Sequence, residues 1–229
     1  MKLGAGKKYK AVAAKVDVFT KYPLAEAIAL AKEVSYAKFG GTLEVHVVTN
    51  ANPKYNDQML RGTVVLPHGT GKKVKVAAFV SDDQIDEAKK AGADIAGNTE
   101  LMQAIENGQI NFDVLITTTE MMRDLAKAAK VLGPKGLMPS PKTGTVTQNL
   151  ATTIDEIKKG RVEFKLDKTG NIHVGVGKLN FANEQLADNV TTLLKAVVEH
   201  RPTGVKGKLI KKVVLAPTMG PGVTLEWQE

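Results

Sequence analysis

The central part of the chain alternates short apolar runs with amphipathic stretches. Residues 74–80 and 112–117 are apolar runs of the length expected of buried strands. Helical patterns lie around them, at 82–91 with Asp82 or Asp83 as the N-cap, at 100–106, at 119–130, and at 153–159 with Thr153 as the N-cap. Strands alternating with helices over short connections predict an α/β unit with a mainly parallel sheet.

The two ends of the chain carry a different pattern. Pro23 opens an amphipathic helix, and residues 42–48 alternate between apolar and polar side chains as a half-buried strand does. We expect a hairpin over residues 161–176, a long helix capped by Asn183, and a final hairpin that joins residues 208–216 to 223–227. Helices and antiparallel strands divided between both ends suggest one α+β domain that the C-terminal half completes.

Side-chain parity separates a core face from a polar face in these strands. Leu43, Val45 and Val47 share one face, so Thr42 points away from the core. The apolar positions of the hairpin are Val162, Phe164, Leu166, Ile172, Val174 and Val176. Lys165 and His173 therefore share the opposite, polar face.

The excess positive charge lies at the two ends. The net charge is +8, and residues 68–159 contain as many acidic as basic residues, so residues 1–67 and 160–229 carry the whole excess. If the two ends form one domain, that domain is a concentrated electrostatic surface for a phosphate backbone. If they are separate, the charge is diluted and the argument for nucleic acid weakens.

Composition excludes several classes of protein. With 43% hydrophobic residues the chain can bury a core, and the absence of cysteine excludes disulfide scaffolds, thiolate zinc sites and a cysteine nucleophile. No apolar run approaches the roughly 20 residues that a membrane span needs. We therefore expect a cytoplasmic protein that does not enter a membrane.

Catalytic chemistry has no clear candidate. The turn Gly69-Thr70-Gly71-Lys72-Lys73 fails as a P-loop, because Leu66 stands where the first glycine is needed and Lys73 stands where Ser or Thr would hold magnesium. The four histidines lack the spacing of a metal site. We therefore expect no cofactor and no enzyme, and a nucleotide-dependent enzyme built on the central α/β unit is kept as an alternative.

Four Gly/Pro-rich segments combine basic residues with glycines that allow another backbone to approach closely. They cover residues 62–72, 132–142, 170–178 and 218–222. The first two flank or lie within the neutral section and are read as turns and linkers. The last two have basic surroundings, so we read them as contact segments.

These segments, in this order and spacing, closely resemble the family of bacterial large-subunit ribosomal protein one, the protein of the mobile stalk beside the tRNA exit site. The resemblance rests above all on Leu-Gly-Pro-Lys-Gly-Leu-Met-Pro at 132–139 and Thr-Met-Gly-Pro-Gly at 218–222, and extends to Lys38-Phe39, Arg61-Gly62-Thr63 and Ala187-Asp188-Asn189. It implies a split RNA-binding α+β domain of residues 1–67 and 160–229, with an inserted Rossmann-like α/β domain of residues 68–159. The fold class is then α/β.

The resemblance also implies partners and contact residues. The partners would be large-subunit ribosomal RNA within the large ribosomal subunit, exit-site tRNA, and the protein's own operon mRNA, whose translation it would repress; the free protein would be a monomer. The RNA surface would map onto Phe39, Thr42, Lys165, His173, Gly177, Lys178, Thr218, Met219 and Gly220. Because only 5% of residues are aromatic, we expect recognition through backbone, ribose hydroxyls and shape rather than extensive base stacking. An RNA-binding regulator outside the ribosome is a second alternative.

At residues 218–220 we expect a surface turn, with the Thr218 hydroxyl and the Met219 side chain free to contact RNA. We expect Gly220 to admit the close approach of RNA, in a backbone conformation that other residues disfavour.

Overall fold

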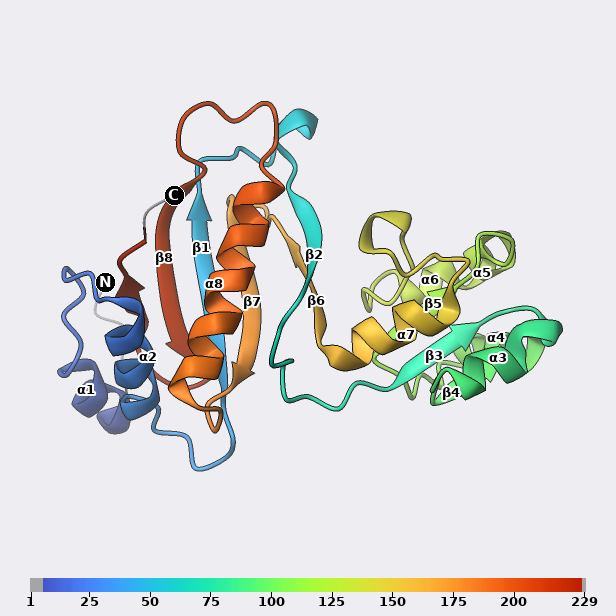
Figure 1. Cartoon of the computed structure of the whole chain (residues 1–229), viewed down its shortest axis with the longest axis horizontal. Coiled ribbons are helices and arrows are strands. Elements are labelled where there is room, and N and C mark those ends of the chain that lie inside the picture. The colour runs from blue at the N-terminus through green and yellow to red at the C-terminus, as the bar shows by residue number, and fades with distance from the viewer. Residues whose placement is uncertain (1–5, 228–229) are drawn as a thin grey trace. The chain divides into compact units, whose positions relative to one another are not determined.

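The computed structural model describes residues 6–227, which divide into two compact units. Unit 1 joins the residues up to Lys72 to those from Val162 onward, and unit 2 runs from Lys73 to Arg161 (Figure 1). These boundaries lie within a few residues of positions 68 and 160, where we placed them. Helices and both parallel and antiparallel strand pairs are present, so the predicted α/β fold class is confirmed.

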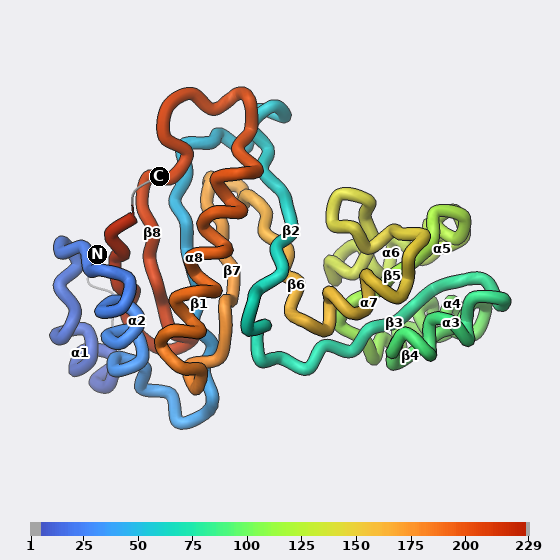
Figure 2. The backbone as a smooth tube through the Cα atoms, in the orientation of Figure 1, coloured from blue at the N-terminus to red at the C-terminus, as the bar shows by residue number. Residues whose placement is uncertain are grey.

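A four-stranded antiparallel sheet forms the centre of unit 1. Its order is β7-β1-β8-β9. The strands are β1 (Thr42–Thr49), β7 (Asn171–Lys178), β8 (Ile210–Pro217) and β9 (Val223–Leu225). β1 comes from the N-terminal half and lies between two strands from the C-terminal half, as the colours of Figure 2 show. Neither end of the chain can therefore form this sheet alone.

Two helices cover one face of that sheet. α2 (Leu24–Glu33) packs on β8 and β9, and α8 (Asn183–Glu199) packs on β7. α2 begins directly after Pro23, as predicted, and buries Ala27, Ile28 and Ala31 at helical spacing. The predicted cap of α8 is one residue late, because Ala182 is the N-cap and Asn183 is the first helical residue. A short helix, α1 (Lys7–Ala13), was not predicted and has no buried residue.

A β-bulge in β7 leaves one backbone carbonyl without a partner strand, and a buried side chain bonds to it. Leu43 pairs with Gly177 and Glu44 pairs with Gly175, so Val176 is the extra residue and loses its place in the ladder. Asn189, fully buried on α8, donates from its amide nitrogen to the Val176 carbonyl at 2.8 Å and to the Gly69 carbonyl at 3.0 Å. Its carbonyl oxygen accepts the His68 backbone N–H at 3.1 Å. Asn189 thus joins a helix, a strand and the segment that leads out of unit 1.

The expected hairpin over residues 161–176 forms only at its turn. β6 (Arg161–Lys165) pairs with β2 (Arg61–Val65) in a separate two-stranded sheet, whereas β7 joins the four-stranded sheet. Between them a bridge at Leu166 and Ile172 remains. The Asp167 carboxylate organises the turn by accepting from the backbone N–H groups of Thr169 and Asn171. A full hairpin is wrong here because β1 and β2 provide longer-range partners.

Unit 2 is a three-layer α/β/α structure. Its parallel sheet has the order β4-β3-β5, from β3 (Val76–Phe79), β4 (Ile95–Gly97) and β5 (Val114–Thr117). Every residue of β3 is buried because it alternates between two cores, Ala77 and Phe79 on one side, Val76 and Ala78 on the other. The helices are α3 (Ile85–Lys90), α4 (Thr99–Glu106), α5 (Met122–Leu125), α6 (Ala129–Leu132) and α7 (Leu150–Lys159).

Several details of unit 2 differ from the sequence prediction. Neither Asp82 nor Asp83 is a cap, because both lie inside a 3-10 turn that precedes α3. Thr153 lies within α7, where its hydroxyl bonds the carbonyl of the actual N-cap, Asn149. The helix predicted at 119–130 is instead α5 and α6 joined by a 3-10 turn at Ala126–Ala128. The three-residue strand β4 was not predicted.

No helix among residues 6–227 is both long and apolar enough to cross a membrane.

We expect Asn189→Ala to lower the free energy of unfolding by about 3 kcal/mol, because the buried Val176 carbonyl loses its partner at about 1–3 kcal/mol and the partly buried groups of His68 and Gly69 lose theirs at a smaller cost. The neighbouring Asp188→Ala removes only an exposed contact with His68, at 3.1 Å, and should cost less than about 1 kcal/mol. Urea unfolding of both variants measures the difference. Equal losses would show that Asn189 is not the central contact of unit 1.

Candidate nucleic-acid interface

The face of the four-stranded sheet opposite α2 and α8 is open. Along β1 every second residue from Leu43 is buried, while Thr42, Glu44, His46 and Val48 are partly exposed. Register places Lys212, Val214 and Ala216 of β8 beside Val48, His46 and Glu44. Thr42 thus points away from the core, as its parity predicted.

Three predicted contact residues meet at one end of this face. Thr42 pairs in register with Lys178, whose Nζ donates to the Thr42 hydroxyl at 3.1 Å. The Thr218 hydroxyl accepts the Thr42 backbone N–H at 2.8 Å and donates to the Thr42 carbonyl at 3.2 Å. We call Thr42, Lys178 and Thr218 the polar cluster. The bulge in β7 helps to form it, because it shifts the register of the strand just before Lys178.

The internal bonds of Thr218 change its expected role. A hydroxyl has one proton and two acceptor sites, so after these two bonds it keeps one acceptor site for a ligand. Thr218 therefore positions Thr42 as well as being able to accept a bond from a ribose hydroxyl. The Thr42 hydroxyl accepts from Lys178, and its proton remains available to a phosphate oxygen.

Two exposed apolar side chains belong to segments beside the polar cluster. Met219 directly follows Thr218 and is 39% exposed, and Phe39, in the segment that leads into β1, is 59% exposed. Phe39 is therefore not a core residue. Exposed methionine and phenylalanine side chains can pack against a sugar or a base.

Gly177 and Gly220, which we predicted to contact RNA, have a packing role in the fold. A Cβ on Gly177, which is buried, would lie 2.9 Å from Leu186 Cδ2, so this glycine lets α8 approach β7. A Cβ on Gly220 would lie 2.6 Å from Pro217 Cγ and 2.9 Å from the Val34 carbonyl oxygen at the end of α2. The φ of Gly220 is not positive, so the backbone conformation expected there is wrong. Both glycines shape the fold beneath the interface.

His173 and Lys165 lie in different sheets. His173, on β7, pairs with His46 of β1, and their Nδ1 atoms are 2.8 Å apart with one ring donating to the other. Its Nε2 lies 3.5 Å from the Asp167 carboxylate. Lys165 is exposed on β6 and therefore belongs to the two-stranded sheet. Both side chains are exposed, although the shared hairpin face we inferred for them does not exist.

His46 is the residue of this face that the sequence reasoning passed over. Its alternation with Leu43, Val45 and Val47 placed it on the polar side, but its partner across the sheet was hidden until β1 and β7 were known to pair. Partial burial lowers the pKa of His46, the nearby charge of His173 lowers it further, and Glu44 opposes the shift.

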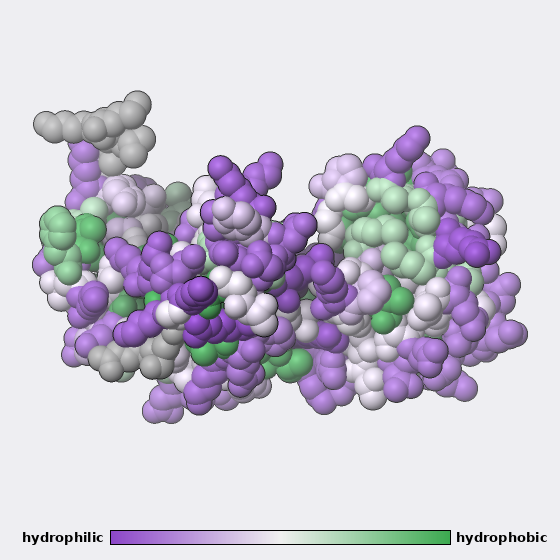
Figure 3. Space-filling model, turned by 90° about the horizontal axis from the view of Figure 1, so that it is seen from above, coloured by the Kyte–Doolittle hydropathy of each residue, from purple (hydrophilic) through white to green (hydrophobic). Residues whose placement is uncertain are grey.

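Charge distinguishes the two units. Between Lys73 and Arg161 the acidic and basic residues balance, so unit 1 carries the whole net charge of +8. Figure 3 shows hydrophilic residues over most of the visible surface of unit 1, at the left, with a few apolar side chains among them.

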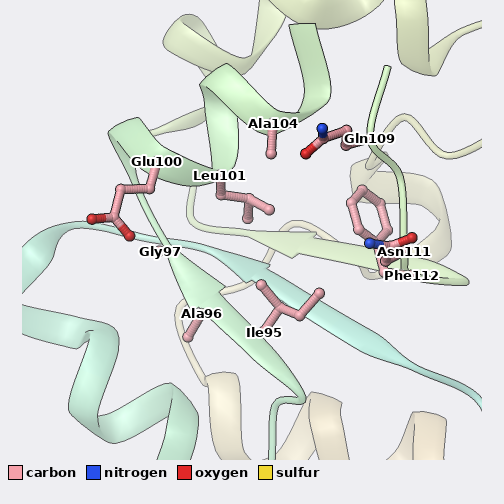
Figure 4. A pocket seen from close by; sticks show the side chains of 9 residues that line it. All are labelled: Ile95, Ala96, Gly97, Glu100, Leu101, Ala104, Gln109, Asn111 and Phe112. Carbon is pink, nitrogen blue, oxygen red and sulfur yellow. The ribbon is translucent and has the colours of Figure 1, made fainter. Parts of the chain in front are cut away.

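Unit 2 offers no comparable site. A pocket of about 200 Å³ beside β4 is lined by apolar side chains, two amides and one carboxylate, Glu100, so it lacks an acid–base pair (Figure 4). The turn at Gly69–Lys73 is followed by strand β3 rather than by the helix that a P-loop requires. In the described residues no three His, Asp or Glu side chains gather as metal ligands would.

The pKa shift of His46 predicts a pH dependence of stability. Because the folded state holds His46 below its ordinary pKa of 6.5, the unfolded state binds a proton first as pH falls. The stability from neutral His46 is present above 6.5 and is lost on acidification. When the pH is lowered from about 7.5 to about 5.5, the melting temperature of His46→Gln should therefore fall by less than that of the unchanged protein. His68→Gln, at an exposed histidine, is the control; a loss in His46→Gln equal to that of the unchanged protein would contradict the prediction.

Comparison with known proteins identifies the family. The model of the ribosomal protein L1p/L10e family matches residues 31–221. The chain is 53% identical to the large ribosomal subunit protein uL1c of Phaeodactylum tricornutum, over 88% of this chain and 87% of that protein. It is 48% identical to the large ribosomal subunit protein uL1 of Thermosipho africanus, over 96% of this chain and 95% of that protein. The resemblance drawn from the sequence motifs is thus confirmed: the chain belongs to the ribosomal protein L1p/L10e family, a family of ribosomal proteins rather than enzymes.

Proposed function

We propose that this protein is a structural constituent of the large ribosomal subunit and binds a folded site in its ribosomal RNA. The relatives named for that subunit, which match most of the chain, support the assembly. The observation that carries RNA binding is the polar cluster of Thr42, Lys178 and Thr218, with exposed Met219 after it, on the unit that holds the whole net charge.

The polar cluster supplies what a folded RNA surface requires. Lys178 neutralises a phosphate, the Thr42 hydroxyl donates to a phosphate oxygen, and the remaining acceptor site of Thr218 receives a ribose 2′-hydroxyl proton. Met219 and Phe39 pack against sugars or an exposed base. His173 and Lys165 extend the contact along unit 1, while Gly177 and Gly220 act by letting the backbone pack closely below it. The protein then recognises its RNA by the shape of the folded site rather than by stacking on a row of bases.

Two finer roles are proposed for the same interface. We propose that the protein takes part in the release of exit-site tRNA from the mobile stalk, and that it represses translation of its own operon mRNA when that mRNA presents a similar folded surface. One interface cannot hold both RNAs at once, so ribosomal RNA and mRNA would compete for it. The free protein would act as a cytoplasmic monomer without a cofactor.

Unit 1 should bind the ribosomal RNA site without unit 2. Replacing residues 73–161 by a short Gly/Ser linker keeps the net charge of +8 and the polar cluster. We expect affinity within about tenfold of the intact protein, since phosphate contacts supply much of the binding energy. Filter binding against the target RNA and a random duplex measures this. If isolated unit 2 binds the target as well as the intact protein does, the assignment of RNA to unit 1 is wrong.

Single substitutions test the polar cluster more closely. Lys178→Met should weaken binding and reduce the slope of log affinity against log salt by about 1. Lys195→Met, which removes the same charge from an exposed position on α8, should change neither. Met219→Ala should cost about 1–3 kcal/mol of affinity and less than about 0.5 kcal/mol of stability. Equal effects of the two lysine substitutions would leave only general electrostatics.

A further inference from the structure

A cationic pocket lies at the far end of β8 from the polar cluster. It has a volume of about 380 Å³, and its charged and aromatic lining consists of Lys21, Lys208, Lys211, Lys212, Glu226 and Trp227. The four lysines are exposed, and none has an ion-pair partner among the described residues. We call this the lysine pocket, and all of it belongs to unit 1.

Three features of the fold bring the four lysines together. Val48 pairs with Lys212 and Thr49 pairs with Ile210, so Lys211 is an extra residue in a β-bulge. A bulge re-aims a side chain that would otherwise point to the opposite face, and here two consecutive lysines line one pocket. Lys21 is held nearby because Tyr22 bridges Leu225 of β9. Lys208 is fixed by its carbonyl, which accepts from the Asn50 side chain at 2.6 Å.

Trp227 adds an unsatisfied donor. Its indole Nε1 is buried and has no hydrogen-bond partner among the described residues. A buried N–H without an acceptor is unfavourable, and so is the mutual repulsion of four ammonium groups with one carboxylate among them. An anionic oxygen in the pocket would reduce the repulsion, and a turn of the indole ring that brought Nε1 to it would satisfy the donor.

We propose that the lysine pocket binds the phosphate backbone of an RNA strand, as a second contact beyond the polar cluster. Lys212 shares the open face of the sheet with Val214 and Ala216, and the polar cluster lies past the other end of β8, roughly 25 Å away for an eight-residue strand. One RNA lying along the open face reaches both. This inference rests on the proposed function, because it extends the same RNA contact.

The lysines favour a polyanion over a small metabolite. They are set around a pocket whose lining includes a single carboxylate, Glu226, and each can neutralise a separate phosphate as a point charge. The partly exposed Trp227 ring also offers a face on which one base can stack. Inorganic pyrophosphate shares the phosphate chemistry but offers only two phosphate groups to the four lysines.

Trp227 makes the test specific, because it is the only tryptophan in the chain. Titration of the full protein with the ribosomal RNA fragment should change Trp227 fluorescence with the same midpoint as filter binding. Inorganic pyrophosphate, used as a second probe, should change it only at far higher concentration. Binding of RNA without any fluorescence change would overturn the lysine pocket and leave the proposed function standing; absence of RNA binding would instead remove the proposed function.

A double variant gives the quantitative test. Lys211→Gln with Lys212→Gln should weaken RNA binding on the order of tenfold and lower the salt slope by up to about 2. The matched control is Lys89→Gln with Lys90→Gln, a consecutive exposed pair on α3 of the neutral unit, which should leave both unchanged. Equal losses in the two double variants would overturn the lysine pocket, because they would leave only general electrostatics.

Discussion

The structure of unit 1 depends on the hydrogen bonds of one buried amide. Asn189 satisfies the Val176 carbonyl that the bulge of β7 removes from the ladder, and it also binds the segment at His68 and Gly69 that leads out of the unit. Without this partner the bulge would leave a buried carbonyl unpaired, which folded proteins avoid. The bulge shifts the register just before Lys178, which contacts Thr42. A buried polar contact therefore sets the geometry of a surface cluster.

Local patterns predicted the elements well and their pairing less well. Parity placed Thr42 on the open face, and the buried run at 74–80 contains β3. The prediction of a hairpin at 161–176 was wrong because only its turn is determined locally. β6 pairs with β2, and the periodicity of side chains along one strand does not reveal which strand it pairs with. The same limit hid the contact of His46 with His173. The roles of Gly177 and Gly220 depend on which side chains pack above them, so they too required the fold.

Unit 1 combines charge with a fixed arrangement of donors and acceptors. Charge alone attracts any nucleic acid, and salt screens that attraction. Selectivity for one folded RNA needs groups held in place, as Thr218 holds the backbone of Thr42 and Lys178 reaches its hydroxyl. The neutral unit 2 adds no net charge, so electrostatics gives no reason for it to compete for the same RNA.

The insertion of unit 2 between the strands of unit 1 has a consequence for synthesis. β1 must wait for β7 and β8, which follow it by more than a hundred residues, so the open face cannot form until nearly the whole chain has been made. Unit 2 is continuous in sequence and can fold while the rest is still being translated. A nascent or truncated chain that ends before β8 thus lacks the four-stranded sheet, and the polar cluster cannot form in it.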